Sequence, residues 1–462
     1  MKLTDKLEDT KSIASVYGVG GLLAPYLQRY KLGDIAEIII SGVDKKTKEG
    51  EQEVGLCNFV DVYHNWAITQ SMHKSFMVAS AKEKDIERLS LKQGYVALTK
   101  DSETRDDIGI STYIADDSDS VILGYHCALV KPNEDILLGK YLNAFLHSNY
   151  IKKYFELNAT GSGMRYTLSA QTLYDIPILL PSLEEQEYIG NIFSTIDRKI
   201  TLNRSINHNL EAMAKQLYDY WFVQFDFPDE NGMPYKSSGG KMVWNEKLKR
   251  EIPEGWNVCR LSEFVSKNNA GDWGTDDPFE NSIEIGCIRG ADIIKLNNLP
   301  KRYIKSSNRA KILSVWDVVI EVSGGSPIQA TGRSAFITSG VIERNGGQIT
   351  CSNFCHAFSF KDYRESAYFF YIWKMFYDNG IMFNYEGKTS GIKNFMTETF
   401  LANKWVKAPK DLIYKFFDTI KSVYSKIDAN ITESNDLIKL RDSLLPLLMN
   451  GQVSVNYDLS ND

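Results

Sequence analysis

Three short stretches of the chain carry residue types that do chemistry in other proteins, and each lacks part of the required pattern. Gly387-Lys388-Thr389 is like the end of a phosphate-binding loop, but that loop needs a glycine five residues before its Gly-Lys pair, and position 382 is Met. Tyr17-Gly18-Val19-Gly20-Gly21 has no strand before it and no suitably spaced acid after it, so it is not a dinucleotide fingerprint. Cys351, Cys355 and His356 could be half of a zinc site, but no second ligand pair lies at a suitable spacing. Buried thiols are the favoured interpretation.

Signatures of DNA methylation and of hydrolysis are missing as well. An adenine methyltransferase would need an Asn-Pro-Pro-aromatic or Asp-Pro-Pro-aromatic turn, and the chain contains no Pro-Pro pair. Its six histidines form no Ser/His/Asp or His-x3-His pattern. The sequence therefore predicts a protein that is not itself an enzyme and has no catalytic residue, no metal site and no cofactor. A nuclease or methyltransferase with unrecognised motifs remains the alternative, which an activity assay on the isolated chain would test.

The elements that would position any site occur twice. Ser194-Thr195-Ile196-Asp197 recurs as Ser425-Lys426-Ile427-Asp428, 231 residues later. Four more landmarks recur in the same order at 228 or 229 residues: Leu32-Gly33-Asp34-Ile35 with Leu261-Ser262-Glu263-Phe264, Cys127 with Cys355, Gly163-Met164-Arg165 with Gly391-Ile392-Lys393, and Pro181 with Pro409. A solenoid repeat spans only roughly 20–50 residues. The sequence therefore predicts two copies of a whole domain with its own appendage, related by a pseudo-two-fold and suited to a partner with two non-identical halves.

The first part of each repeat, roughly 30–180 and 255–408, is predicted to be rich in strands. Buried strands are expected at 94–99 and 317–321, each followed by a polar loop that contains glycine. Further strands are expected at 35–40, 111–114 and 334–337, and helices at 141–146 and 368–373.

The second part of each repeat is predicted to be one long helix. Apolar residues recur at alternating three- and four-residue spacing, which is a heptad seam. The first seam is interrupted by polar Asn203 and consists of Ile189, Ile192, Ile196 and Ile200, followed by Ile206, Leu210, Met213, Leu217 and Tyr220. The second seam is interrupted by polar Ser434 and consists of Ile420, Val423, Ile427 and Ile431, followed by Leu437, Leu444 and Leu448. Near 40 residues make a helix of roughly 60 Å, too long for one small domain to cover. We expect the two seams to cover each other as an intramolecular coiled coil; two ordinary core helices in one bundle are the alternative.

Composition fits a globular protein, with 43% hydrophobic and 24% charged residues. No apolar run approaches the roughly 18 residues of a membrane span, the charged N-terminal residues do not match a secretory signal, and six scattered cysteines fit reduced thiols in the cytoplasm. A net charge of −6 argues mildly against simple nucleic-acid binding, although one face of an acidic protein can still be basic.

Three groups of residues carry a resemblance to a known family. The first is Pro253-Glu254-Gly255-Trp256 with Leu261 just after it, and the second is Trp316-Asp317-Val318-Val319-Ile320 with Gly332-Arg333 and Ala335-Phe336. The third is Gly161-Ser162-Gly163, then Leu173, Ile176-Pro177 and Pro181-Ser182-Leu183-Glu184-Glu185-Gln186. They resemble, in turn, the start of a target recognition domain, its central strand pair and the exit into the conserved helix in the specificity subunit of a type I restriction–modification enzyme. The resemblance covers nearly the whole chain. Two departures stand out: the first copy has Ala24-Pro25-Tyr26 in place of a Pro-x-Gly-Trp opening, and the second helix begins Pro409-Lys410-Asp411 without the Glu-Gln of the first. The second departure puts equal contacts with two methyltransferase subunits in doubt.

The resemblance implies an α/β (α+β) protein with two target recognition domains and two helices that pair antiparallel and hold the domains apart. It implies domains at 1–180, with an N-terminal extension at 1–30, and at 253–408, helical spacers at 181–227 and 409–462, and a linker at 228–252 that is rich in Pro, Gly and Ser at its start. The implied function is recognition of a bipartite, asymmetric site in double-stranded DNA in the cytoplasm. Two methyltransferase subunits and motor-nuclease subunits would join the chain and supply catalysis, with no membrane involved.

Basic residues in polar or Gly-containing loops after apolar strands are the expected DNA contacts, because Arg can bind guanine through two hydrogen bonds and Lys commonly holds phosphate. These residues, with one tyrosine, are Lys100, Arg105, Arg165, Tyr166, Arg289, Arg333, Lys388 and Lys393. The resemblance also suggests a methyltransferase-docking surface within 183–200, at Leu183, Glu184, Glu185, Gln186 and Ile189, with the two glutamates and the glutamine exposed at the helix start. The alternative function is a non-enzymatic, two-lobed scaffold that binds protein. The recognised bases and the gap length are not encoded in any pattern we can interpret.

Overall fold

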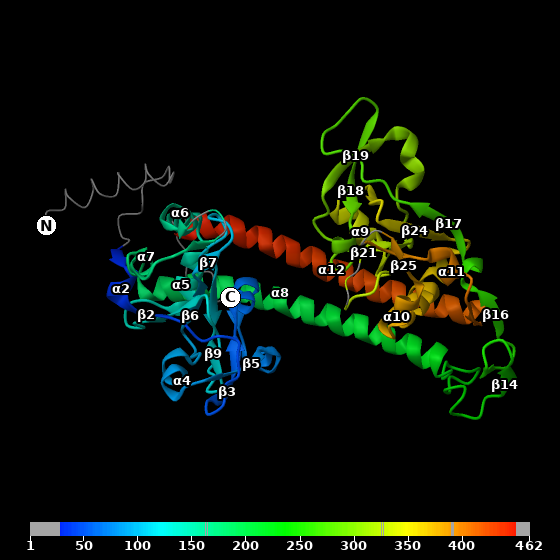
Figure 1. Ribbon diagram of the computed structural model, residues 1–462, viewed down its shortest axis with the longest axis horizontal. Helices are drawn as coiled ribbons and strands as arrows, with labels where there is room; N and C mark the ends of the chain where they lie inside the picture. The colour runs from blue at the N-terminus through cyan, green and yellow to red at the C-terminus, as the bar shows by residue number, and fades with distance from the viewer. Residues whose placement is uncertain are drawn as a thin grey trace, which may run out of the picture. The chain divides into compact units, whose positions relative to one another are not determined.

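The structure is a computed structural model of the chain, and it describes residues 28–449 except Ser162, Met164, Gly325, Pro327, Ser390 and Gly391, and except the side chains of Lys388, Thr389 and Ile392. The Ala24-Pro25-Tyr26 opening lies outside the described residues. The chain forms two compact units (Figure 1). Unit 1 contains the chain up to Thr201 together with the segment from Asn435, and unit 2 contains Leu202–Ser434.

The centre of unit 1 is a five-stranded sheet of order β2-β10-β6-β8-β4. Its strands are Ala36–Ile40, Cys127–Pro132, Val96–Thr99, Ser111–Ile114 and Ala67–Ile68. All four residues of β6 are fully buried. Val96 and Leu98 pack into one hydrophobic core and Ala97 into a second, because successive side chains of a strand point to opposite faces. This burial on both faces explains why β6 is a continuous apolar run in the sequence.

Smaller sheets and short helices surround this centre. The sheets are β5-β3-β9 (Met77–Ala81, Gln52–Cys57, Val121–Leu123), β11-β12-β7 (Thr160–Gly161, Tyr166–Thr167, Asp101–Ser102) and β1-β13 (Gln28–Lys31, Pro177–Leu180). The helices are α2 (Leu32–Ile35), α3 (Phe59–His64), α4 (Glu83–Leu89), α5 (Gly139–Leu146), α6 (Asn149–Asn158) and α7 (Ala170–Tyr174). The first strand of the central sheet therefore begins at Ala36, after one helical turn, and not at Ile35 as predicted.

Unit 2 repeats this topology, except that its central sheet has, in the part of the chain that the structure describes, no strand that corresponds to β4. Its central sheet is β17-β24-β20-β22 (Val265–Ala270, Cys355–Phe360, Val318–Glu321, Ser334–Phe336). The smaller sheets are β19-β18-β23 (Lys301–Lys305, Ser282–Ile288, Ile349–Cys351), β25-β26-β21 (Glu386–Thr389, Ile392–Phe395, Ser323–Gly324) and β16-β27 (Asn257–Arg260, Lys404–Lys407). Its helices include α9 (Ser339–Arg344), α10 (Ser366–Asp378) and α11 (Thr397–Leu401). Strand β20 is again fully buried between two cores, so the duplication predicted from sequence landmarks extends to the packing of matched strands.

Strand pairing fixes which residues of the two units correspond. Cys127 faces Thr99 in unit 1, and Cys355 faces Glu321 in unit 2, so Thr99 corresponds to Glu321. By the same reasoning Tyr166 faces Ser102 and Lys393 faces Gly324. The counterpart of Lys393 is therefore Tyr166 and not Arg165, which corrects the sequence alignment of this hairpin by one residue.

Two long helices follow the strand-rich parts: α8 (Leu183–Tyr218, 36 residues) and α12 (Lys410–Met449, 40 residues). In unit 1 the start of α8 and the end of α12 share a core that includes Ile189, Phe193, Leu445 and Leu448. In unit 2 the end of α8 packs with the start of α12, where the Tyr218 and Phe416 rings lie 6.1 Å apart. The two helices are therefore antiparallel, as predicted.

The polar break in the seam is a buried layer of hydrogen bonds. The Asn203 amide nitrogen lies 2.8 Å from the Glu433 carboxylate and 3.3 Å from the Ser434 hydroxyl. The Asn430 amide donates to the side-chain oxygen of Asn207 at 2.8 Å. A buried asparagine is tolerated in a helical seam when its amide is satisfied, and it disfavours other alignments of the two helices.

Residues 228–252, predicted to be a linker, are packed onto unit 2. The Phe227 ring stacks between Tyr235 at 4.7 Å and Trp256 at 5.1 Å. The Asp226 carboxylate accepts hydrogen bonds from the backbone and hydroxyl of Ser237. The segment ends in a hairpin of β14 (Met242–Asn245) and β15 (Arg250–Pro253). Its many Gly, Pro and Ser residues thus build fixed turns, although the predicted division into domains stays a prediction.

Candidate nucleic-acid interface

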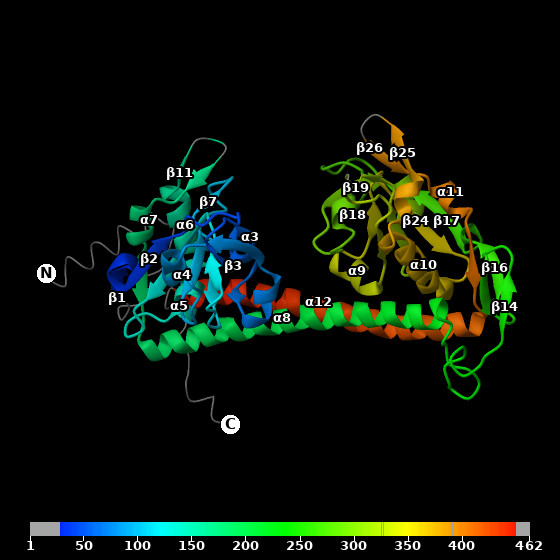
Figure 2. The ribbon, with the colours of Figure 1, turned by 60° about the horizontal axis from the view of Figure 1, so that its bottom comes forward.

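Each unit carries a hairpin attached to its core by one short strand. In unit 1 the hairpin β11–β12 pairs with β7, and in unit 2 the hairpin β25–β26 pairs with β21. Figure 2 shows that within each unit the hairpin lies on the side away from the long helices. Six of the eight predicted DNA contacts lie in, beside or against these hairpins; Arg289 lies in the loop after β18, and Arg333 lies just before β22.

A buried carboxylate collects the charged side chains of unit 1. The Asp101 carboxylate lies 3.1 Å from the Lys100 ammonium, 2.5 Å from Nδ1 of His126 and 3.8 Å from the Arg165 guanidinium. Burial would raise the pKa of Asp101, but hydrogen bonds from Thr167, His126 and Lys100 outweigh it and lower that pKa. Asp101 is therefore ionised near neutral pH and holds Lys100, Arg165 and the His126 ring at the base of the hairpin.

The same hairpin presents two more predicted residues. Arg105 is exposed, and its guanidinium lies over the Tyr166 ring at 5.1 Å. Arg165 is also exposed and rests against the His126 ring, with Nη2 2.6 Å from Nδ1 and 2.7 Å from Nε2. Lys100, Arg165 and Tyr166 are thus brought together with Arg105 in one cluster, which we call the unit 1 cluster: Lys100, Asp101, Arg105, His126, Arg165 and Tyr166.

Unit 2 pairs its basic residues differently. The Arg333 guanidinium makes two hydrogen bonds, at 2.8 and 2.6 Å, to the Glu321 carboxylate, and both side chains are largely buried. The pair raises the pKa of Arg333. A guanidinium held in this way has few donors left to bind a base, so the structure gives Arg333 an internal role that its sequence context did not reveal.

Lys393 and Arg289 are paired as well. The Lys393 ammonium lies 2.8 Å from the Glu386 carboxylate, donates to the Ser326 carbonyl and sits 5.2 Å from the centre of the Phe383 ring. Arg289 is exposed and binds Asp292 through two hydrogen bonds at 2.7 and 2.9 Å. Lys388 lies in β25, but its side chain is outside the described part of the structure. Among the described residues, no contact brings Arg289 together with Lys393.

Sequence reasoning missed the acids and the ring that organise these clusters. Asp101, Glu321 and Glu386 are the carboxylates, and His126 is the ring that supports Arg165. The sequence offered two signals. One is the neighbouring pair Lys100-Asp101, and the other is that His126-Cys127 of the first copy corresponds to Phe354-Cys355 of the second. Glu321 lies 12 residues from its arginine, and spacing alone cannot reveal such a contact.

The predicted docking surface at the start of α8 is only partly exposed. Ser182 caps the helix by accepting from the Glu185 backbone, and the Glu185 carboxylate accepts from Ser182 in return. The expectation that Gln186 is exposed is wrong: it is 1% exposed, because its side chain binds the Leu138 N–H and the Ile136 and Pro181 carbonyls. Ile189 is buried too. Leu183 and Glu184 remain exposed, so a partner that touches this helix start would meet those two first.

Thiol and metal chemistry find no support in the described residues. All six cysteines are buried and free, and burial raises the pKa of Cys355 to about 12. The Cys351 thiol donates to the Cys355 carbonyl, and His356 contacts the Asn268 side chain. Among residues 28–449, apart from the gaps given above, no group of His, Cys, Asp and Glu could hold a metal ion, and no helix is long and apolar enough to cross a membrane.

Comparison with known proteins places the sequence in context. A family model described as the type I restriction modification DNA specificity domain matches residues 27–212. The specificity subunit of the type I restriction enzyme MjaIX from Methanocaldococcus jannaschii is 24% identical over 325 residues, which cover 70% of this chain and 71% of that protein. The HindI specificity subunit from Haemophilus influenzae is 22% identical over 414 residues, which cover 76% of this chain and 85% of that protein.

A solved structure shares the fold. The crystal structure of the S subunit of a type I restriction–modification system from M. genitalium has a TM-score of 0.51 and 13% identity, and the match covers 93% of this chain and 98% of that one. At this identity the likeness shows the fold alone. It agrees with the duplicated mixed α and β units and the two long antiparallel helices described above.

Proposed function

This chain belongs to the specificity subunits of type I restriction–modification systems, and on that premise we propose that its two units each bind one half of a split site in double-stranded DNA. The duplication is the observation that carries the proposal. Two units with similar sheets, the same register at matched strands and a hairpin at the same place are suited to two short DNA segments. Because the charged residues around the hairpins differ between the units, the two half-sites would differ in sequence.

The chemistry of methylation and cleavage belongs, in this proposal, to partner subunits in the cytoplasm. Two methyltransferase subunits and motor-nuclease subunits would assemble on the helical parts of the chain. The start of α8 offers Leu183 and Glu184 to a methyltransferase subunit, while Gln186 and Ile189 hold the helix against unit 1. Reversing the charge at Glu184 should weaken co-purification with that subunit. Reversal at Glu185 would also break the helix cap, so Glu184→Lys is the cleaner variant.

The paired helices are proposed to set the length of the unread gap. Each helix packs into the cores of both units, so an insertion in one helix alone would unpack one end. Four residues inserted after Thr201 and four after Ser434 leave the buried hydrogen bonds of Asn203 intact and lengthen both helices by roughly 5–6 Å, which is one or two base pairs at about 3.4 Å each. We expect the same half-sites with a gap longer by one or two base pairs. If the variant folds and still recognises half-sites separated by the original gap, the helices are not the spacer.

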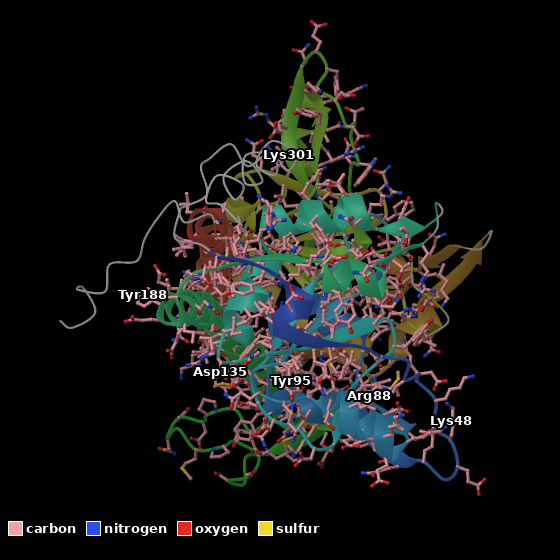
Figure 3. The ribbon with its side chains drawn as sticks, turned by 90° about the vertical axis from the view of Figure 1, so that its left-hand side faces the viewer. Lys48, Arg88, Tyr95, Asp135, Tyr188 and Lys301 are labelled. Carbon is pink, nitrogen blue, oxygen red and sulfur yellow. The ribbon has the colours of Figure 1, made fainter. Side chains whose placement is uncertain are left out.

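Methylation mapping tests the proposal as a whole. The chain co-expressed with its methyltransferase subunits should modify one bipartite sequence, and the purified chain alone should modify none. Arg105→Ala should relax one position of one half-site and weaken binding by roughly 1–3 kcal/mol. Arg88→Ala on α4, where the side chain is exposed outside the hairpin, is the matched control (Figure 3). A complex that modifies no split site would favour the protein-binding scaffold instead.

A further inference from the structure

Phe354 of unit 2 is an exposed aromatic side chain on a rigid base. Phe354 is the last residue of the three-residue loop Ser352-Asn353-Phe354 between β23 and β24, and it is 55% exposed. The Ser352 carbonyl accepts the Cys355 N–H at 2.9 Å, and the Phe354 carbonyl accepts the N–H groups of Val322 and Ser323 at 2.8 and 3.2 Å. Because the backbone is held on both sides, binding would have to fix only the torsions of the ring and not the loop that carries it.

The corresponding position of unit 1 lies against the hairpin. The Lys100 N–H donates to the His126 carbonyl in unit 1, and the Val322 N–H donates to the Phe354 carbonyl in unit 2. His126 and Phe354 each directly precede one of the two matched cysteines. His126 touches Arg165, the residue just before β12. The same place in the fold therefore holds a polar ring among charges in unit 1 and an apolar ring in unit 2.

The backbone of Phe354 is bonded to the start of the strand that pairs with the unit 2 hairpin. Ser323, whose N–H binds the Phe354 carbonyl, begins β21, and the next residue of β21, Gly324, pairs with Lys393 of β26. Lys393 in turn lies over Phe383, which is 42% exposed. A lysine suits a phosphate, whereas a neighbouring apolar side chain suits the one apolar group that a base edge presents in the major groove, the C5-methyl of thymine.

We propose that Phe354 packs on the methyl group of a thymine and so determines one position of the half-site bound by unit 2. The proposal rests on the proposed function, because it assumes that unit 2 binds DNA with this hairpin side. This inference goes beyond the proposed function because it names the residue, the base and the contact between them. His126 at the same place in unit 1 would give that unit no such preference.

The experiment uses the complex with its methyltransferase subunits and a duplex that carries the mapped site. Each thymine of both half-sites is replaced in turn by deoxyuridine, which removes only the methyl group, and the dissociation constant is measured by fluorescence anisotropy. One replacement should weaken binding of the unaltered complex about fourfold, the value of one buried methyl group. Phe354→Ala should bind the thymine duplex more weakly by a similar or larger factor and should no longer distinguish thymine from deoxyuridine.

Two further variants show whether the preference depends on the side chain at position 354. Phe354→Leu keeps an apolar side chain and should retain the preference for thymine. Trp244→Ala removes another aromatic side chain of 55% exposure, on β14, and should leave the preference unchanged. Equal binding of thymine and deoxyuridine duplexes at every position, or an equal preference in Phe354→Ala, would overturn the proposal. Either result would leave recognition of a split site intact, whereas failure of the proposed function would show as no split site at all.

Discussion

The two units share their sheets but not the way they hold charge beside the hairpin. In unit 1 a single carboxylate, Asp101, faces Lys100, His126 and Arg165. In unit 2 the acids and bases form separate pairs, Glu321 with Arg333 and Glu386 with Lys393. One scaffold therefore supports two electrostatic designs. The difference lies in a few side chains on fixed strands, as the proposed recognition of two unlike half-sites would require.

The largest expected effect is on the internal pair of unit 2. Glu321 is 2% exposed, and its carboxylate is close to Gly290 and Gly324, where a Cβ would lie 2.7 Å from Oε1. Glu321→Ala leaves the Arg333 guanidinium buried without a partner, which should lower the free energy of unfolding by roughly 3–5 kcal/mol. Urea unfolding of the purified chain measures this change.

Two further variants separate a lost ion pair from lost packing. Glu321→Met with Arg333→Met removes both charges and should unfold close to the unaltered protein. Thr99→Val, at the matched position of unit 1, keeps the side-chain shape but loses the hydroxyl that accepts from the Ile110 N–H, and should cost about 1 kcal/mol. A double variant as unstable as Glu321→Ala would show that shape, and not charge, matters at this position.

The sequence predicted the frame of both units but not their charge networks. Strands β6 and β20 and the helices α8 and α12 follow from apolar runs and heptad spacing, which are local patterns. The pairing of Asp101 with Arg165, 64 positions later in the chain, depends on how β7 meets β12, and no spacing encodes it. Gln186 was misjudged for a similar reason: a polar residue in a first helical turn is normally solvated, but here it satisfies backbone groups of a neighbouring loop.

An intermediate effect is expected from acid on unit 1. His147 at the end of α5 is partly buried, and desolvation of its ring lowers its pKa to about 4; its Nε2 lies 2.9 Å from the Ser111 carbonyl. The folded unit therefore favours neutral His147, whereas the unfolded chain takes up a proton near pH 6.5. Stability from this group is complete above about pH 6.5 and is lost as pH falls toward 4, by about 3 kcal/mol in all.

The control for this acid effect is His147→Gln, whose amide can donate to the same carbonyl without titrating. Thermal unfolding of the two proteins between pH 7 and pH 4.5 should show a steeper loss for the unaltered chain. Limited proteolysis at pH 5 should then cut unit 1 before unit 2. Parallel losses in both proteins would mean that His147 does not distinguish the units.

The smallest expected effect concerns the cations that Asp101 holds. Asp101→Asn removes the negative charge beside Lys100 and Arg165, so these two side chains become available to phosphates. Binding of the complex to non-specific duplex DNA should strengthen by a few fold, and the salt dependence should steepen by about 0.9 in log K against log salt for each new phosphate contact. Glu386→Gln in unit 2 should change the slope less, because Lys393 stays bound to the Ser326 carbonyl and lies over Phe383.

If Asp101→Asn instead leaves the slope unchanged and alters one base of a half-site, then Asp101 itself contacts a base, since a carboxylate can accept from cytosine N4. In that case the shared carboxylate would be a recognition group of unit 1 rather than the anchor of its cations.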